Sequence, residues 1–104
     1  MAIQNTTLTT AAANILVGSG SLGTATTTVY LCNKTASSIV VNLYAVNSGF
    51  TANTNNIIYS NVTLTTNETY IMDVEKLFLG PGDMLQANAS IANGVVATVS
   101  SIGL

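Results

Sequence analysis

The stretch Thr24–Val46, TATTTVYLCNKTASSIVVNLYAV, contains two segments whose side chains alternate in character residue by residue. In an extended chain, every second side chain lies on the same face. The residues expected to share one face are Ala25, Thr27, Val29 and Leu31 in Thr24–Asn33, and Ile39, Val41, Leu43 and Ala45 in Ile39–Val46. Both segments are rich in β-branched and aromatic residues, which suit a pleated surface. They predict two β-strands joined by a short polar turn.

Similar segments lie on both sides of this stretch. Further strands are expected in Leu8–Val17, which supplies one or two, and in Ile57–Thr65, Thr69–Asp73, Met84–Ala92 and Val95–Ile102. The dipeptide Asn93-Gly94 between the last two predicts a β-hairpin, because Asn-Gly suits the tight turn of a two-residue loop. The best helical candidate, Val74–Leu79, is short and is followed by Gly-Pro-Gly. The predicted fold is all-β: a two-sheet β-sandwich or jelly roll of seven to eight antiparallel strands.

The length of 104 residues is typical of a single domain. We expect residues 11–104 to form one β-sandwich domain, and the polar residues 1–10 to form an N-terminal arm available for interaction. The loop Asn47–Asn56 is polar except for Phe50 and Ala52. Phe50 either folds back on the core or contacts a neighbour in an assembly, since isolated aromatic residues anchor interfaces.

Ionisable side chains are nearly absent. The chain has no His, one Cys and only two Lys or Arg and four Asp or Glu, against 16 Thr, 12 Asn and 9 Ser. General acid–base catalysis needs a titratable base, and Cys32 has no His to activate it, so we expect no enzyme. Only Lys34 and Lys76 are positively charged, which argues against a surface for nucleic acid.

The acidic residues all lie between Glu68 and Asp83. Asp73 and Glu75 suggest a Ca²⁺ site, but two carboxylates cannot supply the six or more oxygens that this ion takes. We interpret them as acids that keep a strand end soluble, and we expect no metal and no cofactor. The apolar runs fall far short of the ~18 residues of a membrane-spanning helix, and Met1–Gln4 does not resemble a secretory signal. The sequence predicts no membrane association.

The four tyrosines lie in predicted strands: Tyr30, Tyr44, Tyr59 and Tyr70. Such residues are either ordinary strand residues with one apolar and one hydrated end, or a stacking surface for sugars in a carbohydrate-binding module. The absence of Trp favours the first interpretation.

Three segments resemble a known group of proteins: VYLCNKTASSIVVNLYAVNSG (Val29–Gly49), YIMDVEKLFLGPGDMLQANAS (Tyr70–Ser90) and the C-terminal VVATVSSIGL. From about Asn14 onward, the chain is similar to small Thr- and Asn-rich all-β virion proteins of tailed bacteriophages. Members of this group serve as decoration (cement), neck, tail or fibre-associated proteins. The resemblance implies a virion component that is assembled in the host cytoplasm.

The leading hypothesis is a capsid decoration protein that binds the major capsid protein or other virion proteins and stabilises the shell. The decoration hypothesis also implies a homo-oligomer, with a trimer favoured. A neck, tail or fibre-associated component is the first alternative, and a carbohydrate-binding module is an alternative from another class. The candidate interface residues are Ile3, Phe50, Leu77 and Phe78.

Overall fold

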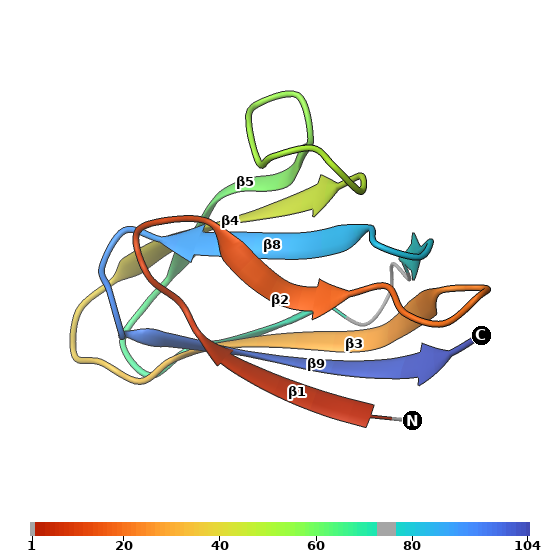
Figure 1. Cartoon of the computed structure of the whole chain (residues 1–104). Coiled ribbons are helices and arrows are strands. Elements are labelled where there is room, and N and C mark those ends of the chain that lie inside the picture. Colours follow the sequence, from red (N-terminus) through yellow and green to blue (C-terminus); the bar gives the residue numbers. More distant parts are fainter. Residues whose placement is uncertain (1, 73–76) are drawn as a thin grey trace.

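The computed structural model describes residues 2–72 and 77–104, and these residues form two packed antiparallel sheets without a helix (Figure 1). The strands are β1 (Ala2–Thr7), β2 (Ala13–Val17), β3 (Thr24–Asn33), β4 (Ile39–Val46), β5 (Ile57–Leu64), β6 (Thr69–Met72), β7 (Phe78–Leu79), β8 (Met84–Ala89) and β9 (Val95–Gly103). One sheet has five strands in the order β1-β9-β3-β6, with β7 also paired to β3. The other has four in the order β2-β8-β4-β5. The predicted all-β, two-sheet fold is confirmed.

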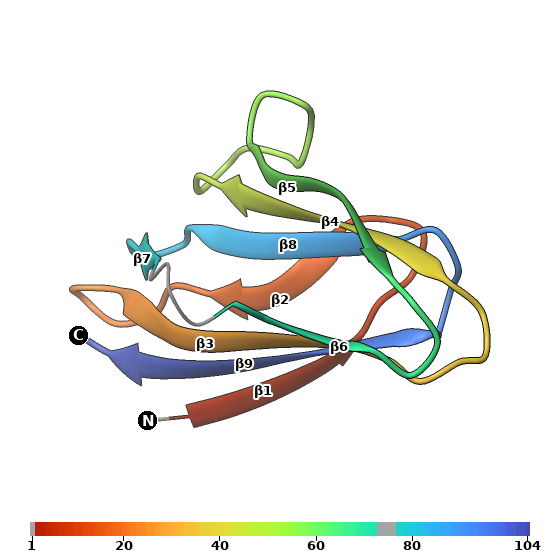
Figure 2. The ribbon, with the colours of Figure 1, turned by 180° about the vertical axis from the view of Figure 1, so that it is seen from behind.

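The strand order is that of a jelly roll. Antiparallel pairing joins β4 to β5, β3 to β6, β2 to β8 and β1 to β9. The chain therefore folds like one long hairpin whose tip is the β4–β5 loop, and successive strand pairs alternate between the two sheets. Figure 2 shows the two layers from behind, with this tip loop beyond the end of β4. The short β7 is an addition to the eight strands of the roll.

The core lies between the two sheets. Alternate residues of β8 and β9 are buried, and those of β4 are buried over its first half. The fully buried side chains include Leu43, Leu85 and Val99, which come from both sheets. Burying a Leu or Val side chain contributes about 1.5–3 kcal/mol. The alternation seen in the sequence thus supplies one apolar face to each sheet.

The predicted hairpin at Asn93-Gly94 is wrong. β8 pairs with β2 and β4, whereas β9 pairs with β1 and β3, so the turn crosses from one sheet to the other. Asn93 does adopt the positive φ that its turn signal implies, at 64°. The turn therefore has the backbone conformation that Asn-Gly predicts, but β8 and β9 do not pair with each other. They belong to opposite sheets, whose buried faces meet in the same core.

The predicted faces of β3 and β4 are partly wrong. A register shift between Thr26 and Thr28 marks a β-bulge in β3, and a bulge reverses the alternation beyond it. Thr26 is consequently buried inside the sandwich, while Val29 and Leu31 face the core as expected. In β4, Ala45 is only half-buried.

The segment expected to form an arm contains β1. This strand pairs with β9 in an unbroken register from Ala2↔Ser101 to Thr7↔Val96, and the following Leu8 is fully buried. Residues 2–7 are thus an edge strand of the five-stranded sheet. In the segment Val74–Leu79, residues 74–76 lie outside the described residues, as does Asp73, and Phe78–Leu79 form β7. In the described part of the chain, no helix is long and apolar enough to cross a membrane.

Candidate functional site: an uncharged sheet face

The outer face of the five-stranded sheet gathers exposed apolar side chains from all five of its strands. Directly paired residues point to the same side of a sheet. Ile3 pairs with Ser100, and Tyr30 pairs with both Thr98 and Ile71. We call this surface the five-stranded face, and it consists of Ile3, Asn5, Thr7, Ala25, Thr28, Tyr30, Cys32, Thr69, Ile71, Phe78, Val96, Thr98, Ser100 and Ile102.

The bulge in β3 extends this face toward β7. Beyond the bulge, Ala25 pairs with Ile102 on one side and with Phe78 on the other. Ala25 is buried between these two exposed residues. Phe78 is 75% exposed and Ile3 is 71% exposed, while Tyr30, Ile71 and Ile102 are also exposed. The bulge therefore places Ala25 on the same side of the sheet as its two apolar partners, Phe78 and Ile102.

No residue of the five-stranded face is charged; the rest of it is mainly hydroxyl and amide side chains. The Thr98 hydroxyl donates to Asn5 Oδ1 at 2.8 Å, which pairs two of these groups across β1 and β9. Single exposed apolar residues are normal on protein surfaces, but several on one uncharged sheet face favour an interaction surface. The five-stranded face can be covered by another protein without desolvating an ion.

The outer face of the four-stranded sheet differs, because amide side chains bond to each other there. Asn42 Nδ2 donates to Asn88 Oδ1 at 3.1 Å, and Asn42 Oδ1 accepts from the backbone N–H of Asn61 at 2.7 Å. Gln86 Nε2 donates to Asn14 Oδ1 at 2.6 Å. These amides hold neighbouring strands together across β2, β8, β4 and β5. Fewer of their hydrogen-bonding groups are left for a partner.

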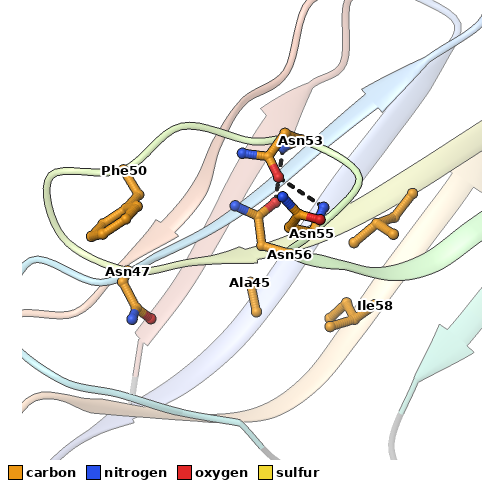
Figure 3. A pocket seen from close by; sticks show the side chains of 8 residues that line it. Ala45, Asn47, Phe50, Asn53, Asn55, Asn56 and Ile58 are labelled. Atoms are coloured by element: carbon orange, nitrogen blue, oxygen red, sulfur yellow. Dashed lines mark hydrogen bonds between the residues drawn. The ribbon is translucent and has the colours of Figure 1, made fainter.

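The tip loop between β4 and β5 forms an open hollow of about 470 Å³ (Figure 3). Phe50 and Asn47 lie on one side of it, and the turn containing Asn53 and Asn56 lies on the other. Both Asn53 Nδ2 and Asn56 Nδ2 donate to the Thr51 carbonyl, and Asn56 Oδ1 accepts from the Asn53 N–H. These amides therefore set the loop conformation. Phe50 is exposed and does not fold back on the core.

The structure places two of the four predicted interface residues on the same sheet face. Ile3 and Phe78 share the five-stranded face, whereas Phe50 lies in the tip loop. Leu77 is half-buried against the core and lines a smaller hollow of about 250 Å³. Sequence reasoning missed Ile71 and Ile102, which are exposed. The sequence signals them only by placing an apolar residue where the alternation of the strand expects an outward side chain.

The tyrosines do not form one surface. Tyr30 lies on the five-stranded face, and Tyr44 lies on the outer side of the other sheet, where it pairs with Gln86. Tyr59 and Tyr70 pack edge to face with each other, with ring centroids 6.2 Å apart, and both are partly buried against the core. Since Tyr30, Tyr44 and the Tyr59–Tyr70 pair lie in three different places, the four rings do not form one stacking surface, and the carbohydrate-binding alternative stays a prediction.

The described carboxylates serve the connections between strands. Glu68 accepts from the N–H and the hydroxyl of Thr65. Asp83 accepts from the N–H groups of Gly80 and Ser48, at 3.0 and 2.9 Å, and so ties the β7–β8 turn to the tip loop. Within residues 2–72 and 77–104, no three His, Cys, Asp or Glu side chains gather where they could hold a metal ion. Cys32 is a half-buried free thiol.

The comparisons with protein-family models, curated proteins and solved structures found no match to this chain, so its function is inferred here from its surfaces.

Proposed function

We propose that this chain is a structural component of a tailed-bacteriophage particle: a capsid decoration protein that binds the assembled shell through the five-stranded face and stabilises it. The observation that carries the proposal is the concentration of five exposed, large apolar side chains on a sheet face without charge. The jelly-roll topology supports it as well, because this topology recurs in viral capsid proteins. Lectins share the topology, so the surface and not the fold carries the proposal.

The physical basis of attachment is apolar burial with little ion desolvation. Each Å² of apolar surface removed from water contributes about 25 cal/mol. Thr28 and Ser100 add hydroxyl groups that can both donate and accept hydrogen bonds, and the Thr98 hydroxyl, which donates to Asn5, can still accept one. A shell held together by such contacts opens less readily, because opening re-exposes the apolar area.

The test is binding of the full chain to purified shells that lack it. Ile71→Asp and Phe78→Asp place a carboxylate on the five-stranded face, and both positions are exposed, so the core stays intact. We expect both variants to fold but to lose co-sedimentation with the shells. Thr63→Asp is the matched control, because Thr63 is exposed and pairs with Val40 on the outer side of the other sheet. It should bind like the wild type.

The outcome that would contradict the attachment surface is co-sedimentation of the Ile71→Asp and Phe78→Asp variants at wild-type levels. Cryo-electron microscopy of the parent particle tests the location. Density on the capsid exterior in hundreds of copies supports decoration, whereas density at the neck, tail or fibre in a few copies contradicts it and supports the first alternative.

A further inference from the structure

Strand β1 leaves one side of the five-stranded sheet open. It pairs with β9 on one side only, and Figures 1 and 2 both show it at the border of the sandwich with no strand beyond it. Within the described residues, no backbone hydrogen bond reaches residues 2–7 from any segment except β9. An uncovered edge strand offers unpaired N–H and C=O groups to another strand.

The register identifies which backbone groups point outward. Leu8 N–H donates to the Val95 carbonyl at 2.8 Å, in line with the pairing of β1 and β9. In an antiparallel ladder, bonded positions alternate along the strand, so the even residues of β1 bond to β9. The N–H and C=O groups of Ile3, Asn5 and Thr7 therefore point to the open side. Their side chains lie on the five-stranded face.

The other described sheet edges are less suited to pairing. β2 contains a register shift between Asn14 and Leu16, and the pairing of β5 with β4 shifts twice, with Asn61 at a φ of 57°. β6 has only four residues. Bulges and short strands are known devices that blunt an edge. β1 has six residues in one register, without a bulge, a proline or a charge.

We propose that two copies of this chain dimerise by antiparallel pairing of β1 with β1 about a twofold axis. Such an interface is isologous, which means that the same backbone groups of β1 form the contact in both copies. An axis through Asn5 pairs Asn5 with Asn5 of the second copy and Ile3 with Thr7 of the second copy. That register uses the N–H and C=O of all three outward residues.

The charge distribution favours a second copy as the occupant. Like charges directly opposite each other on adjacent strands are destabilising, and neither β1 nor any other strand of this sheet carries a charge. Pairing a strand with itself therefore meets no repulsion here. The dimer joins two five-stranded sheets into one continuous sheet, so two uncharged faces lie side by side. This dimer differs from the trimer that the family resemblance favours, and it does not depend on attachment to a shell.

Sedimentation equilibrium of the full chain tests the proposal. We expect the mass to rise with concentration from 10.7 kDa to twice that value and no further. Amide hydrogen exchange followed by NMR provides a second measurement. The amides of Ile3, Asn5 and Thr7 should become protected only as the dimer forms, whereas Gln4 and Thr6 should be protected at every concentration.

Asn5→Pro removes one outward N–H from each copy and no bond to β9, and proline is tolerated at such an edge position. We expect the dissociation constant of the dimer to rise about tenfold or more. Asn5→Ala is the matched control, because it loses the same bond from the Thr98 hydroxyl but keeps the N–H, and it should dimerise. Should Asn5→Pro not fold, Asn5→Lys tests the same contact by placing two positive charges opposite each other.

Three results would overturn the proposal: a monomer at all concentrations, a trimer, or a dimer that both Asn5→Pro and Asn5→Lys leave intact. Protection of the three outward amides only when shells are added to an otherwise monomeric protein would also overturn it, and would assign the edge to a shell protein.

Discussion

Asn33 is a polar side chain that the fold buries completely. Its Nδ2 donates to the carbonyls of Ser37, Leu64 and Thr65 at 2.7–3.0 Å. Its Oδ1 accepts from both the N–H and the hydroxyl of Thr35. One amide thereby holds the β3–β4 and β5–β6 connections together. In the sequence it is one of twelve Asn residues with nothing to distinguish it.

Removing this amide should destabilise the protein strongly. Asn33→Ala removes the side-chain donor of the buried Leu64 carbonyl and of the part-buried Ser37 and Thr65 carbonyls, and we expect the free energy of unfolding to fall by about 3 kcal/mol. Urea denaturation measures it. Asn47→Ala is the control: Asn47 is exposed, and its side chain makes no hydrogen bond with the described residues, so its change should stay within about 0.5 kcal/mol. Equal, small losses for both variants would contradict this role for Asn33.

At the scale of the elements, strand positions were predictable but strand faces only in part. Thr24–Asn33 and Ile39–Val46 agree with β3 and β4 at both ends. The bulge in β3 could not be predicted, because it depends on how β3 pairs with β9. Its consequence is that Thr24 and Thr26 are buried, and the Thr26 Oγ1 accepts from the Leu77 N–H at 2.9 Å. An alternating pattern without a bulge places Thr27 inward instead.

Two matched substitutions in β3 test this arrangement. Thr26→Val keeps the side-chain shape but leaves the Leu77 N–H without its acceptor, and should cost about 2 kcal/mol of stability, or roughly 10 °C in melting temperature. Thr28→Val changes an outward residue whose hydroxyl makes no hydrogen bond with the described residues, and should change stability by less than about 0.5 kcal/mol. Thermal unfolding followed by circular dichroism compares them. Similar melting temperatures for the two variants would contradict the inward position of Thr26.

At the scale of the whole molecule, the charged side chains among residues 2–72 and 77–104 all lie in the connections between strands. None of the nine strands contains a Lys, Arg, Asp or Glu. Lys34 follows β3 in the β3–β4 connection, and Glu68 precedes β6 in the β5–β6 connection. Asp83 lies in the β7–β8 turn. Both sheet faces are consequently built from apolar, hydroxyl and amide side chains. This distribution suits a protein whose sheets contact other protein.

Attachment through the five-stranded face should depend little on salt. Surface ion pairs weaken as ionic strength rises, but apolar and uncharged polar contacts do not. We expect the affinity for shells to change less than about threefold between 0.05 and 0.5 M NaCl, measured by co-sedimentation. A steep loss of binding with salt would assign attachment to the charged connections instead of the five-stranded face.

The sequence by itself determined the all-β class, the positions of most strands and the scarcity of ionisable side chains. These properties follow from residue types and from alternation between near neighbours along the chain. Only the tertiary structure decided that β8 and β9 belong to different sheets, that Asn33 is buried, and that Ile3, Tyr30 and Phe78 share one face beside an open edge. Those features depend on pairs such as Ile3 and Ser100, far apart in the sequence, and such pairs form because both sheets must bury their inner faces in the same core.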